Sequence, residues 1–144
     1  MAEFVADEMN AFNVKIIEDF RANNGTVTID PFVGAPIVLV HHVGAKSGVE
    51  RISPLAYTRD GDDVIIIASK GGTPENPAWY HNLRANPDTT IELGPDTIEV
   101  TAEALTEGPE RERLFNQMGD QMPNFHEYQT KTERLIPVVV LHRR

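Results

Sequence analysis

The chain has 144 residues, contains no cysteine and carries a formal net charge of −9 at pH 7. This length suits one domain, so we expect a single domain over residues 1–144. The absence of cysteine excludes disulfides, thiolate catalysis and iron–sulfur clusters. The excess of acidic groups argues against a nucleic-acid partner, because a polyanion is bound by a basic surface.

The sequence carries no signal for export or membrane insertion. Residues 1–10 include three acidic side chains and no apolar run of the kind found in secretory signals. No apolar stretch approaches the roughly 20 residues that a membrane helix needs. We therefore expect a cytoplasmic protein without a transmembrane segment. Peripheral contact with the inner face of the membrane stays open.

Apolar periodicity defines the expected elements in chain order. Met9, Phe12, Ile16 and Phe20 recur at steps of three and four, so residues 7–22 are predicted to form an N-terminal helix. β-branched and alternating apolar segments predict strands. These cover residues 36–40, 51–59, 63–68, 89–93, 97–105 and 135–142.

Cap and turn residues add two helices and two hairpins. Asn76 suits the N-cap of a helix over residues 77–85, and a second helix is predicted over residues 109–118. Residues 60–61 (Asp-Gly) and 94–95 (Gly-Pro) indicate tight hairpin turns. Short strands joined by hairpins predict an antiparallel sheet that closes on itself, in place of a doubly wound parallel sheet.

Two basic, glycine-containing turns are candidate anion sites. Residues 41–51 supply Lys46 and Arg51 beside glycines, and residues 68–72 supply a hydroxyl and an ammonium group before two glycines. Both turns follow strands expected to be neighbours, which favours one shared site. Residues 41–84 hold five basic and five acidic side chains, so the acidic excess lies elsewhere. Ordinary polar turns remain the alternative interpretation.

Other candidate residues have simpler interpretations when taken alone. Trp79, the only tryptophan, either forms the wall of a site for a flat ring or packs with Leu83 in a buried helical stripe, and packing is the better interpretation. His41 and His42 are adjacent in a strand and point to opposite faces, so we expect no metal site there. The sequence contains no dinucleotide-binding, P-loop or hydrolase motif.

Four ordered motifs carry a more specific signal. They are His42-x-Gly44-x-Lys46-Ser47-Gly48-x-x-Arg51-x-x-Pro54-Leu55, Ala68-Ser69-Lys70-Gly71-Gly72, Asn76-Pro77-x-Trp79-Tyr80-x-Asn82-Leu83 and Tyr128-Gln129-x-x-Thr132-x-Arg134-x-Ile136-Pro137-Val138. Together they resemble the deazaflavin (coenzyme F420)-dependent nitroreductase family over nearly the whole chain. The resemblance implies a mainly β, α+β fold, namely an antiparallel split β-barrel of the flavin-reductase type.

The resemblance also implies the cofactor and its contacts. Reduced coenzyme F420 would be the hydride donor. Its phosphate and acidic tail would contact Ala45, Lys46, Ser47, Gly48 and Arg51. Its ring would contact Pro54, Leu55, Ala56, Ile67, Ala68, Ser69 and Lys70, and the pocket would be completed by Ala78, Trp79, Tyr80, His81 and Asn82. The cofactor supplies the hydride chemistry, and the protein supplies orientation and electrostatics.

The acceptor side of the site follows from the last motif and from departures from the family. The expected substrate-binding residues are Met122, Phe125 and Tyr128. Relatives active on bicyclic nitroimidazoles have tyrosines at the first two positions, so quinones or activated enones become better candidate acceptors. Ala56 also replaces a tyrosine that some relatives have. Ser69 and Tyr128 are the expected catalytic residues, placed to hydrogen-bond the acceptor or supply a proton.

The resulting hypothesis is an F420H2-dependent reductase that passes hydride to a small organic acceptor. Two alternatives stay open: a split-barrel oxidoreductase that binds FMN, and a barrel that binds a lipid or cofactor without turnover. The sequence leaves monomer and weak dimer equally open.

Overall fold

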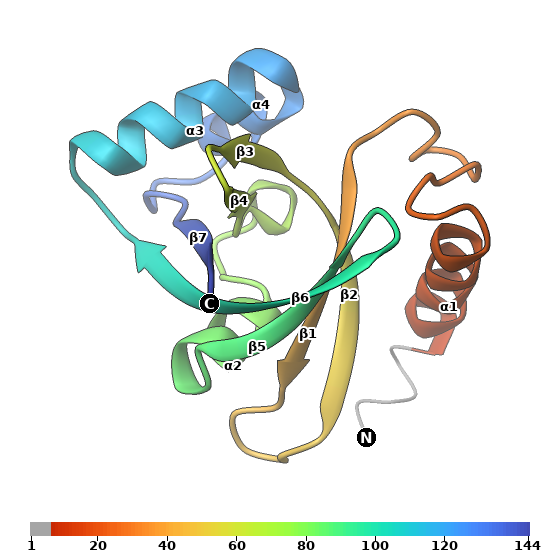
Figure 1. Cartoon of the computed structure of the whole chain (residues 1–144). Helices are drawn as coiled ribbons and strands as arrows, with labels where there is room; N and C mark the ends of the chain where they lie inside the picture. Colours follow the sequence, from red (N-terminus) through yellow and green to blue (C-terminus); the bar gives the residue numbers. More distant parts are fainter. Residues whose placement is uncertain (1–6) are drawn as a thin grey trace.

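The computed structural model describes residues 7–144, with side chains described from residue 11 onward. Four α-helices, seven strands and one short 3-10 helix follow one another along the described chain (Figure 1). In order they are α1 Asp7–Ala22, β1 Ile37–Val43, β2 Glu50–Ala56, β3 Thr58–Asp60, β4 Asp63–Ile67, η1 Lys70–Gly72, α2 Ala78–Ala85, β5 Asp88–Leu93, β6 Asp96–Leu105, α3 Pro109–Gln121, α4 Asn124–Thr130 and β7 Val138–Arg143.

The seven strands form one antiparallel sheet that curls so that its edges approach. The strand order is β2-β1-β5-β6-β7-β4-β3, which places β2 and β3 at opposite edges. These two strands are nevertheless joined by the single residue Tyr57. Since two peptide steps span at most about 7.6 Å, the two edges must meet there. The sheet is therefore a half-closed barrel, and the expected antiparallel split β-barrel is confirmed.

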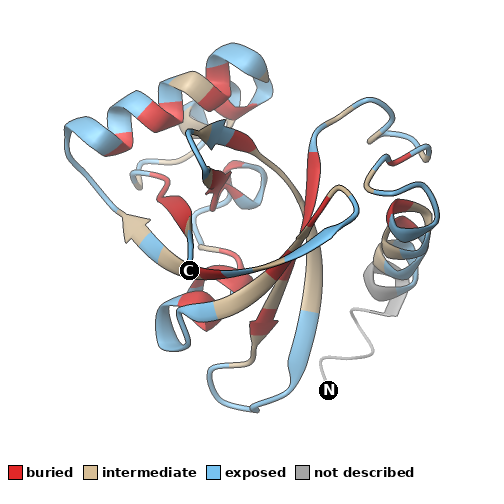
Figure 2. Cartoon of the chain, in the orientation of Figure 1, coloured by how far each residue is buried: buried red, intermediate tan, exposed pale blue. Residues whose placement is uncertain are grey.

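Strands β4 and β7 are buried along most of their length (Figure 2). In β4, Val64 and Ile66 pack inside the barrel with α2, whereas Ile65 and Ile67 pack outside against α3 and α4. β7 follows the same pattern. A strand covered on both faces has no polar side to show, which explains the continuous apolar runs in the sequence.

Helix α1 covers the outer face of β1 and β2. Ile16 and Phe20 are fully buried against Leu39, as the apolar stripe predicts. Phe12 is 37% exposed and lies against Phe32 with ring centroids 6.1 Å apart. The side chain of Met9, the first residue of the predicted stripe, lies outside the described residues.

An ion pair joins α1 to the sheet. Arg21 donates two hydrogen bonds to the carboxylate of Glu92, at 2.9 and 2.6 Å, and His41 lies 2.8 Å from the same carboxylate. The hydrogen bond from Arg21 outweighs the opposing effect of burial and lowers the pKa of Glu92 to about 2. The carboxylate thus stays ionised under neutral conditions and links helix α1 to strands β1 and β5.

We expect the stability of the protein to fall in acid partly through Glu92. Its folded pKa lies below its unfolded value of about 4.5. The stabilisation is therefore complete above pH 4.5 and is lost as the pH falls toward 2. Thermal melts of Glu92→Gln and wild type should differ most near pH 7, and the difference should shrink below pH 4.5 and vanish only below about pH 2. A pH-independent difference would contradict this assignment.

Several element boundaries differ from the sequence-based expectation. β1 runs to Val43, beyond the predicted end at residue 40, and α3 runs to Gln121, beyond residue 118. The strand predicted over residues 51–59 divides at Tyr57 into β2 and β3, because the chain there crosses from one sheet edge to the other. The last strand begins at Val138, three residues later than predicted. Asn76 does not cap α2: Pro77 is the N-cap residue, and the Asn76 side chain accepts a hydrogen bond from Arg134 instead.

The structure also contains two short helical segments that the sequence analysis did not assign, η1 and α4. Both lie beside the site described below. Over the described part of the chain, none of the helices combines the length and apolar character needed to cross a bilayer.

Candidate functional site

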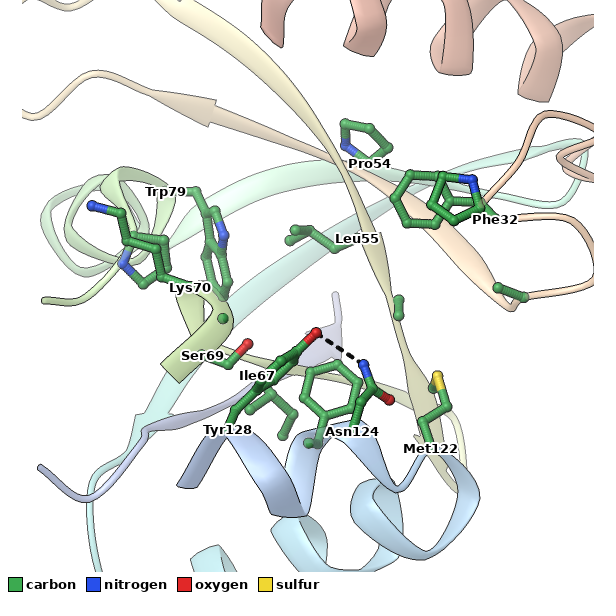
Figure 3. A pocket seen from close by; sticks show the side chains of 16 residues that line it. Phe32, Pro54, Leu55, Ile67, Ser69, Lys70, Trp79, Met122, Asn124 and Tyr128 are labelled. Carbon is green, nitrogen blue, oxygen red and sulfur yellow. Dashed lines mark hydrogen bonds between the residues drawn. The ribbon is translucent and has the colours of Figure 1, made fainter. Parts of the chain in front are cut away.

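A cavity of about 560 Å³ lies where the barrel is split. Its walls come from the end of β2, the end of β4 with η1, the start of α2, and α4, with a loop after α1 along the rim (Figure 3). The lining residues are Pro31, Phe32, Ala35, Pro54, Leu55, Ala56, Ile67, Ser69, Lys70, Gly71, Pro77, Trp79, Met122, Asn124, Phe125 and Tyr128. We call this the first cavity. Sheet closure at Tyr57 is what brings these distant segments together.

The first cavity combines apolar walls with a few polar groups on one side. Trp79 and Leu55 lie across from Ser69 and Tyr128 in Figure 3. The side-chain amide of Asn124 donates to the Tyr128 oxygen at 3.0 Å. Because that oxygen accepts this bond, the phenolic hydrogen is free to be donated into the cavity. An apolar pocket with few convergent polar groups is the usual form of a small-molecule site.

The loop that carries Ser69 and Lys70 is held in an unusual conformation. Lys70 has φ +46°, followed by Gly71 at +67° and Gly72 at +86°. Ser69 is in the right-handed region and Lys70 in the left-handed one, and this succession turns neighbouring backbone N–H groups toward one side, an arrangement that suits an anion. A non-glycine residue with positive φ persists only where its surroundings hold it, and such strain is common at functional sites.

Arg134 holds this loop from behind. Its guanidinium donates to the backbone oxygens of Ala68 and Ser69, at 3.3 and 2.9 Å, and to that of Thr73 at 2.9 Å. It also donates to the Asn76 side chain at 2.6 Å. The motif residue Arg134 therefore stabilises the segment between β4 and α2, which explains its place among the ordered motifs.

A second cavity of about 560 Å³ lies beside the first. Its lining residues are Asn13, Val14, Ile17, His42, Glu50, Arg51, Ile52, Ser53, Ala78 and Trp79. Trp79 lines both cavities, and along β2 the second cavity ends at Ser53 where the first begins at Pro54. The two cavities thus form neighbouring parts of one elongated site. Only the second part contains an arginine.

Two residues of the second cavity, Arg51 and His42, could carry a positive charge, and only Arg51 does so near neutral pH. Burial, with smaller contributions from the charges of Arg51 and His41, lowers the pKa of His42 to about 4. His42 is therefore uncharged near neutral pH. Arg51 is exposed and forms no ion pair with the described residues. Its guanidinium can donate hydrogen bonds to an anionic ligand. The carboxylate of Glu50 lines the same cavity and would repel that ligand.

The structure brings together most of the residues expected around the ring. Ten of the sequence-predicted positions line the first cavity: Pro54, Leu55, Ala56, Ile67, Ser69, Lys70, Trp79, Met122, Phe125 and Tyr128. Trp79 therefore fits both interpretations, since it is 7% exposed in the core and also walls both cavities.

Other predicted positions lie apart from the first cavity. Arg51 and Ala78 line the second cavity only. Ala68 is fully buried in the core, and Tyr80 lines a separate cavity between α2 and strands β6 and β7. His81 is exposed, and Asn82 is buried with its amide hydrogen-bonded inside the protein.

The first basic turn lies outside both cavities. Ala45, Lys46, Ser47 and Gly48 are exposed at the tip of the β1–β2 connection, and none of them lines either cavity. The backbone N–H of Ala45 is nevertheless tied to Asn82 at 2.9 Å. Lys46 can therefore reach a ligand only from the rim.

Sequence reasoning missed several residues of the site. Phe32 and Pro31 come from a loop without periodicity, so no pattern indicated their position. Asn124 is four residues before Tyr128, and this spacing on a helix was the available signal. Ser53 was not assigned because it lies between two motif positions.

His41 and His42 do face opposite sides of β1. His41 is hydrogen-bonded to Glu92, and His42 to Ser53. Within the described residues, no group of three or more His, Asp or Glu side chains is arranged to hold a metal ion.

Fold and site together define a class: a split β-barrel whose elongated site suits a flat ring joined to an anionic chain. The first cavity has the apolar walls that a ring needs, and the second has Arg51 for an anion. Comparison with known proteins gives the family. Residues 14–143 match the family model described as F420H(2)-dependent quinone reductase, and the chain belongs to that family.

Individual relatives agree. The chain is 43% identical over 127 residues to the F420H(2)-dependent quinone reductase Rv1261c of Mycobacterium tuberculosis, covering 87% of this chain and 85% of that one. A solved structure of an F420-H2 dependent reductase, FDR-A, superposes with a TM-score of 0.68 at 42% identity, covering 74% and 94% of the chains. Another, described as a domain-swapped dimer, gives 0.70 at 35% identity and covers 98% of each chain.

The family is F420H2-dependent, so the protein is an oxidoreductase that uses reduced coenzyme F420. The reductase hypothesis is confirmed, and neither the FMN alternative nor the non-catalytic barrel is favoured.

Proposed function

We propose that the chain reduces quinones, with the deazaflavin ring of coenzyme F420 in the first cavity and its anionic tail in the second. The observation that carries this proposal is the pair of adjoining cavities that share Trp79. When bound, reduced F420 supplies a hydride. The chain's own residues hold the reactants in register and keep water from their reacting faces.

On the cofactor side, the positive charge lies in the second cavity and the flat apolar surface in the first. Arg51 would contact the phosphate or carboxylates, with Lys46 reaching them from the rim, and both are long donors suited to anionic oxygens. Pro54, Leu55 and Trp79 would lie against the ring. Lys70 lines the first cavity from the strained loop, and its ammonium group is 3.5 Å from Glu75. A ligand anion would compete with that exposed ion pair at little cost.

On the acceptor side, Met122, Phe125 and Tyr128 form an apolar end of the first cavity. The rings of Phe125 and Tyr128 meet edge to face with centroids 5.5 Å apart. A flat, weakly polar quinone suits these walls better than a nitroimidazole that needs several hydroxyl partners. Ser69 and Tyr128 would donate hydrogen bonds to a quinone oxygen as charge develops there.

We predict that Ser69→Ala and Tyr128→Phe separate binding from reduction. Each variant removes one donor to the acceptor oxygen, so hydride transfer should slow by roughly tenfold or more. Coenzyme F420 should bind each variant nearly as well as wild type. Stopped-flow single turnovers with a short-chain benzoquinone, followed at the absorbance of F420, would measure the rate. Fluorescence titration would measure binding.

The same assay tests the acceptor. Quinones should be reduced faster than bicyclic nitroimidazoles at equal concentrations. If nitroimidazoles prove the better acceptors, the proposed role of Met122 and Phe125 is wrong. Unchanged hydride transfer in both hydroxyl variants would instead leave the site acting by holding the two reactants together.

A further inference from the structure

A chain of three hydrogen bonds runs from the first basic turn to the second cavity. The backbone N–H of Ala45 lies 2.9 Å from Oδ1 of Asn82, and Nδ2 of Asn82 lies 3.0 Å from Nδ1 of His42. Nε2 of His42 lies 2.9 Å from Oγ of Ser53. Asn82 is 7% exposed and His42 3% exposed, so these side chains are shielded from water that could replace their partners.

The direction of every bond in this chain follows from its first member. A backbone N–H can only donate, so Oδ1 of Asn82 accepts and the amide orientation is set. Nδ2 of Asn82 must then donate, which makes Nδ1 of His42 the acceptor. His42 is neutral because burial and nearby charges lower its pKa to about 4, so its single hydrogen lies on Nε2. His42 therefore donates to Ser53.

The direction of these bonds fixes the hydrogen-bonding role of the Ser53 hydroxyl. Its oxygen accepts from His42, so its own hydrogen must be donated elsewhere, and His42 is its only side-chain partner among residues 11–144. Ser53 lines the second cavity at the point where the first begins. Arg51 lies two residues earlier on β2 and lines the same cavity. Alternate strand residues share a face, so the hydroxyl and the guanidinium are presented side by side.

An anionic oxygen is the acceptor that best suits this pair. The other ionisable groups along the cavity are Glu50 and the neutral His42, and Glu50 is exposed with His41 3.6 Å away. A hydroxyl whose oxygen already accepts a hydrogen bond is a stronger donor, because neighbouring bonds polarise one another.

We propose that Ser53 binds an anionic oxygen of the cofactor tail, and that His42 and Asn82 are positioning residues that turn its hydroxyl hydrogen into the cavity. This inference rests on the proposed function, which places the tail in the second cavity. It extends the site to a residue between two motif positions. The proposal also gives Asn82 an indirect role in cofactor binding: its amide is hydrogen-bonded to Ala45 and His42, so it orients His42 and does not contact the cofactor.

The first test compares two ligands and two variants. Coenzyme F420 has the phosphate and glutamate tail, whereas 8-hydroxy-5-deazariboflavin has the same ring and ribityl chain without it. Ser53→Ala should bind F420 about tenfold more weakly, with unchanged binding of the tail-less compound. Ser53→Thr keeps the hydroxyl on a strand-compatible side chain and should restore F420 binding. Equal F420 binding by Ser53→Ala and wild type would overturn the proposal, as would equal losses for both ligands.

The second test reverses the hydrogen-bond chain. Asn82→Asp can still accept from Ala45, but its ionised carboxylate cannot donate to His42. The histidine should then carry its hydrogen on Nδ1, and Ser53 should donate inward to Nε2. Imidazole ¹⁵N NMR of the protein without ligand should report the Nε2–H form in wild type and the Nδ1–H form in Asn82→Asp. A wild-type Nδ1–H form would overturn the assignment.

A double-mutant cycle separates this reversal from the added charge. Asn82→Asp should weaken F420 binding more in the wild-type background than in the Ser53→Ala background, because charge repulsion acts in both but hydroxyl direction acts only in the first. Equal losses would show that Asn82 does not act through Ser53. Failure of wild type to bind F420 at all would instead overturn the proposed function, so the two failures are distinguishable.

Discussion

Replacing Arg51 by alanine is expected to raise the dissociation constant of coenzyme F420 by roughly ten- to a hundred-fold. Arg51 is the arginine that lines the second cavity, and it has no competing ion pair among the described residues. A charge-assisted hydrogen bond contributes about 1.5–3 kcal/mol. Turnover at saturating cofactor should change much less, since the lost contact is remote from the reacting ring.

Lys46 should matter less than Arg51. It is exposed at the turn and lines neither cavity, so Lys46→Ala is expected to weaken binding by a smaller factor. Arg59→Ala is the matched control, because it removes an exposed positive charge from β3, away from both cavities. Binding should also weaken at high salt in wild type and respond less to salt in Arg51→Ala. Equal F420 affinity for Arg51→Ala and wild type would contradict the placement of the tail.

The second large effect is expected at Gly72. This residue has φ +86°, and a Cβ added there would lie 2.6 Å from the backbone oxygen of Tyr128. That oxygen is held by a hydrogen bond from Lys131 at the end of α4, so it cannot easily move. Gly72→Ala should combine left-handed strain of about 1–2 kcal/mol with a backbone clash, for a total of roughly 3 kcal/mol.

Two measurements check the Gly72 prediction. The thermal midpoint should fall by roughly 6–12 °C for a chain of this size. Hydride transfer should also slow, because α4 carries Tyr128 and must shift to admit the new methyl group. Gly61→Ala is the matched control, since Gly61 has φ +63° but open space around it. It should show only the strain, with normal turnover. Equal destabilisation by both changes would mean that the contact between η1 and α4 is looser than the structure indicates.

How far the site can be predicted from sequence is clearest along β2. The motifs predicted that Pro54 and Leu55 contact the ring and that Arg51 contacts the anionic tail, and in the structure Pro54 and Leu55 line the first cavity and Arg51 the second. The sequence predicted a single strand over residues 51–59, but it did not show that residues 50–53 line one cavity and residues 54–56 the other. Which neighbours complete each cavity depends on α1 and α4, whose docking no local pattern specifies.

Asn82 and Tyr80 are motif residues that line neither the first nor the second cavity. Family resemblance indicated both as cofactor contacts, yet both side chains are buried, one hydrogen-bonded to Ala45 and His42 and the other beside Arg84. A motif records that a position is constrained, and it does not distinguish a residue that touches a ligand from one that orients its neighbour.

The sequence by itself determined the nature of this protein's elements and its family. Apolar periodicity depends on which residues must avoid water, and turn residues depend on local backbone sterics, so both act over a few residues and can be recognised in the chain. The tertiary structure alone decided where the cavities lie. Closure of the sheet at Tyr57 brings β2, β4 and α4 together, although they are far apart in the chain. Such long-range contacts are set by the packing of whole elements against one another, which no short window of sequence contains.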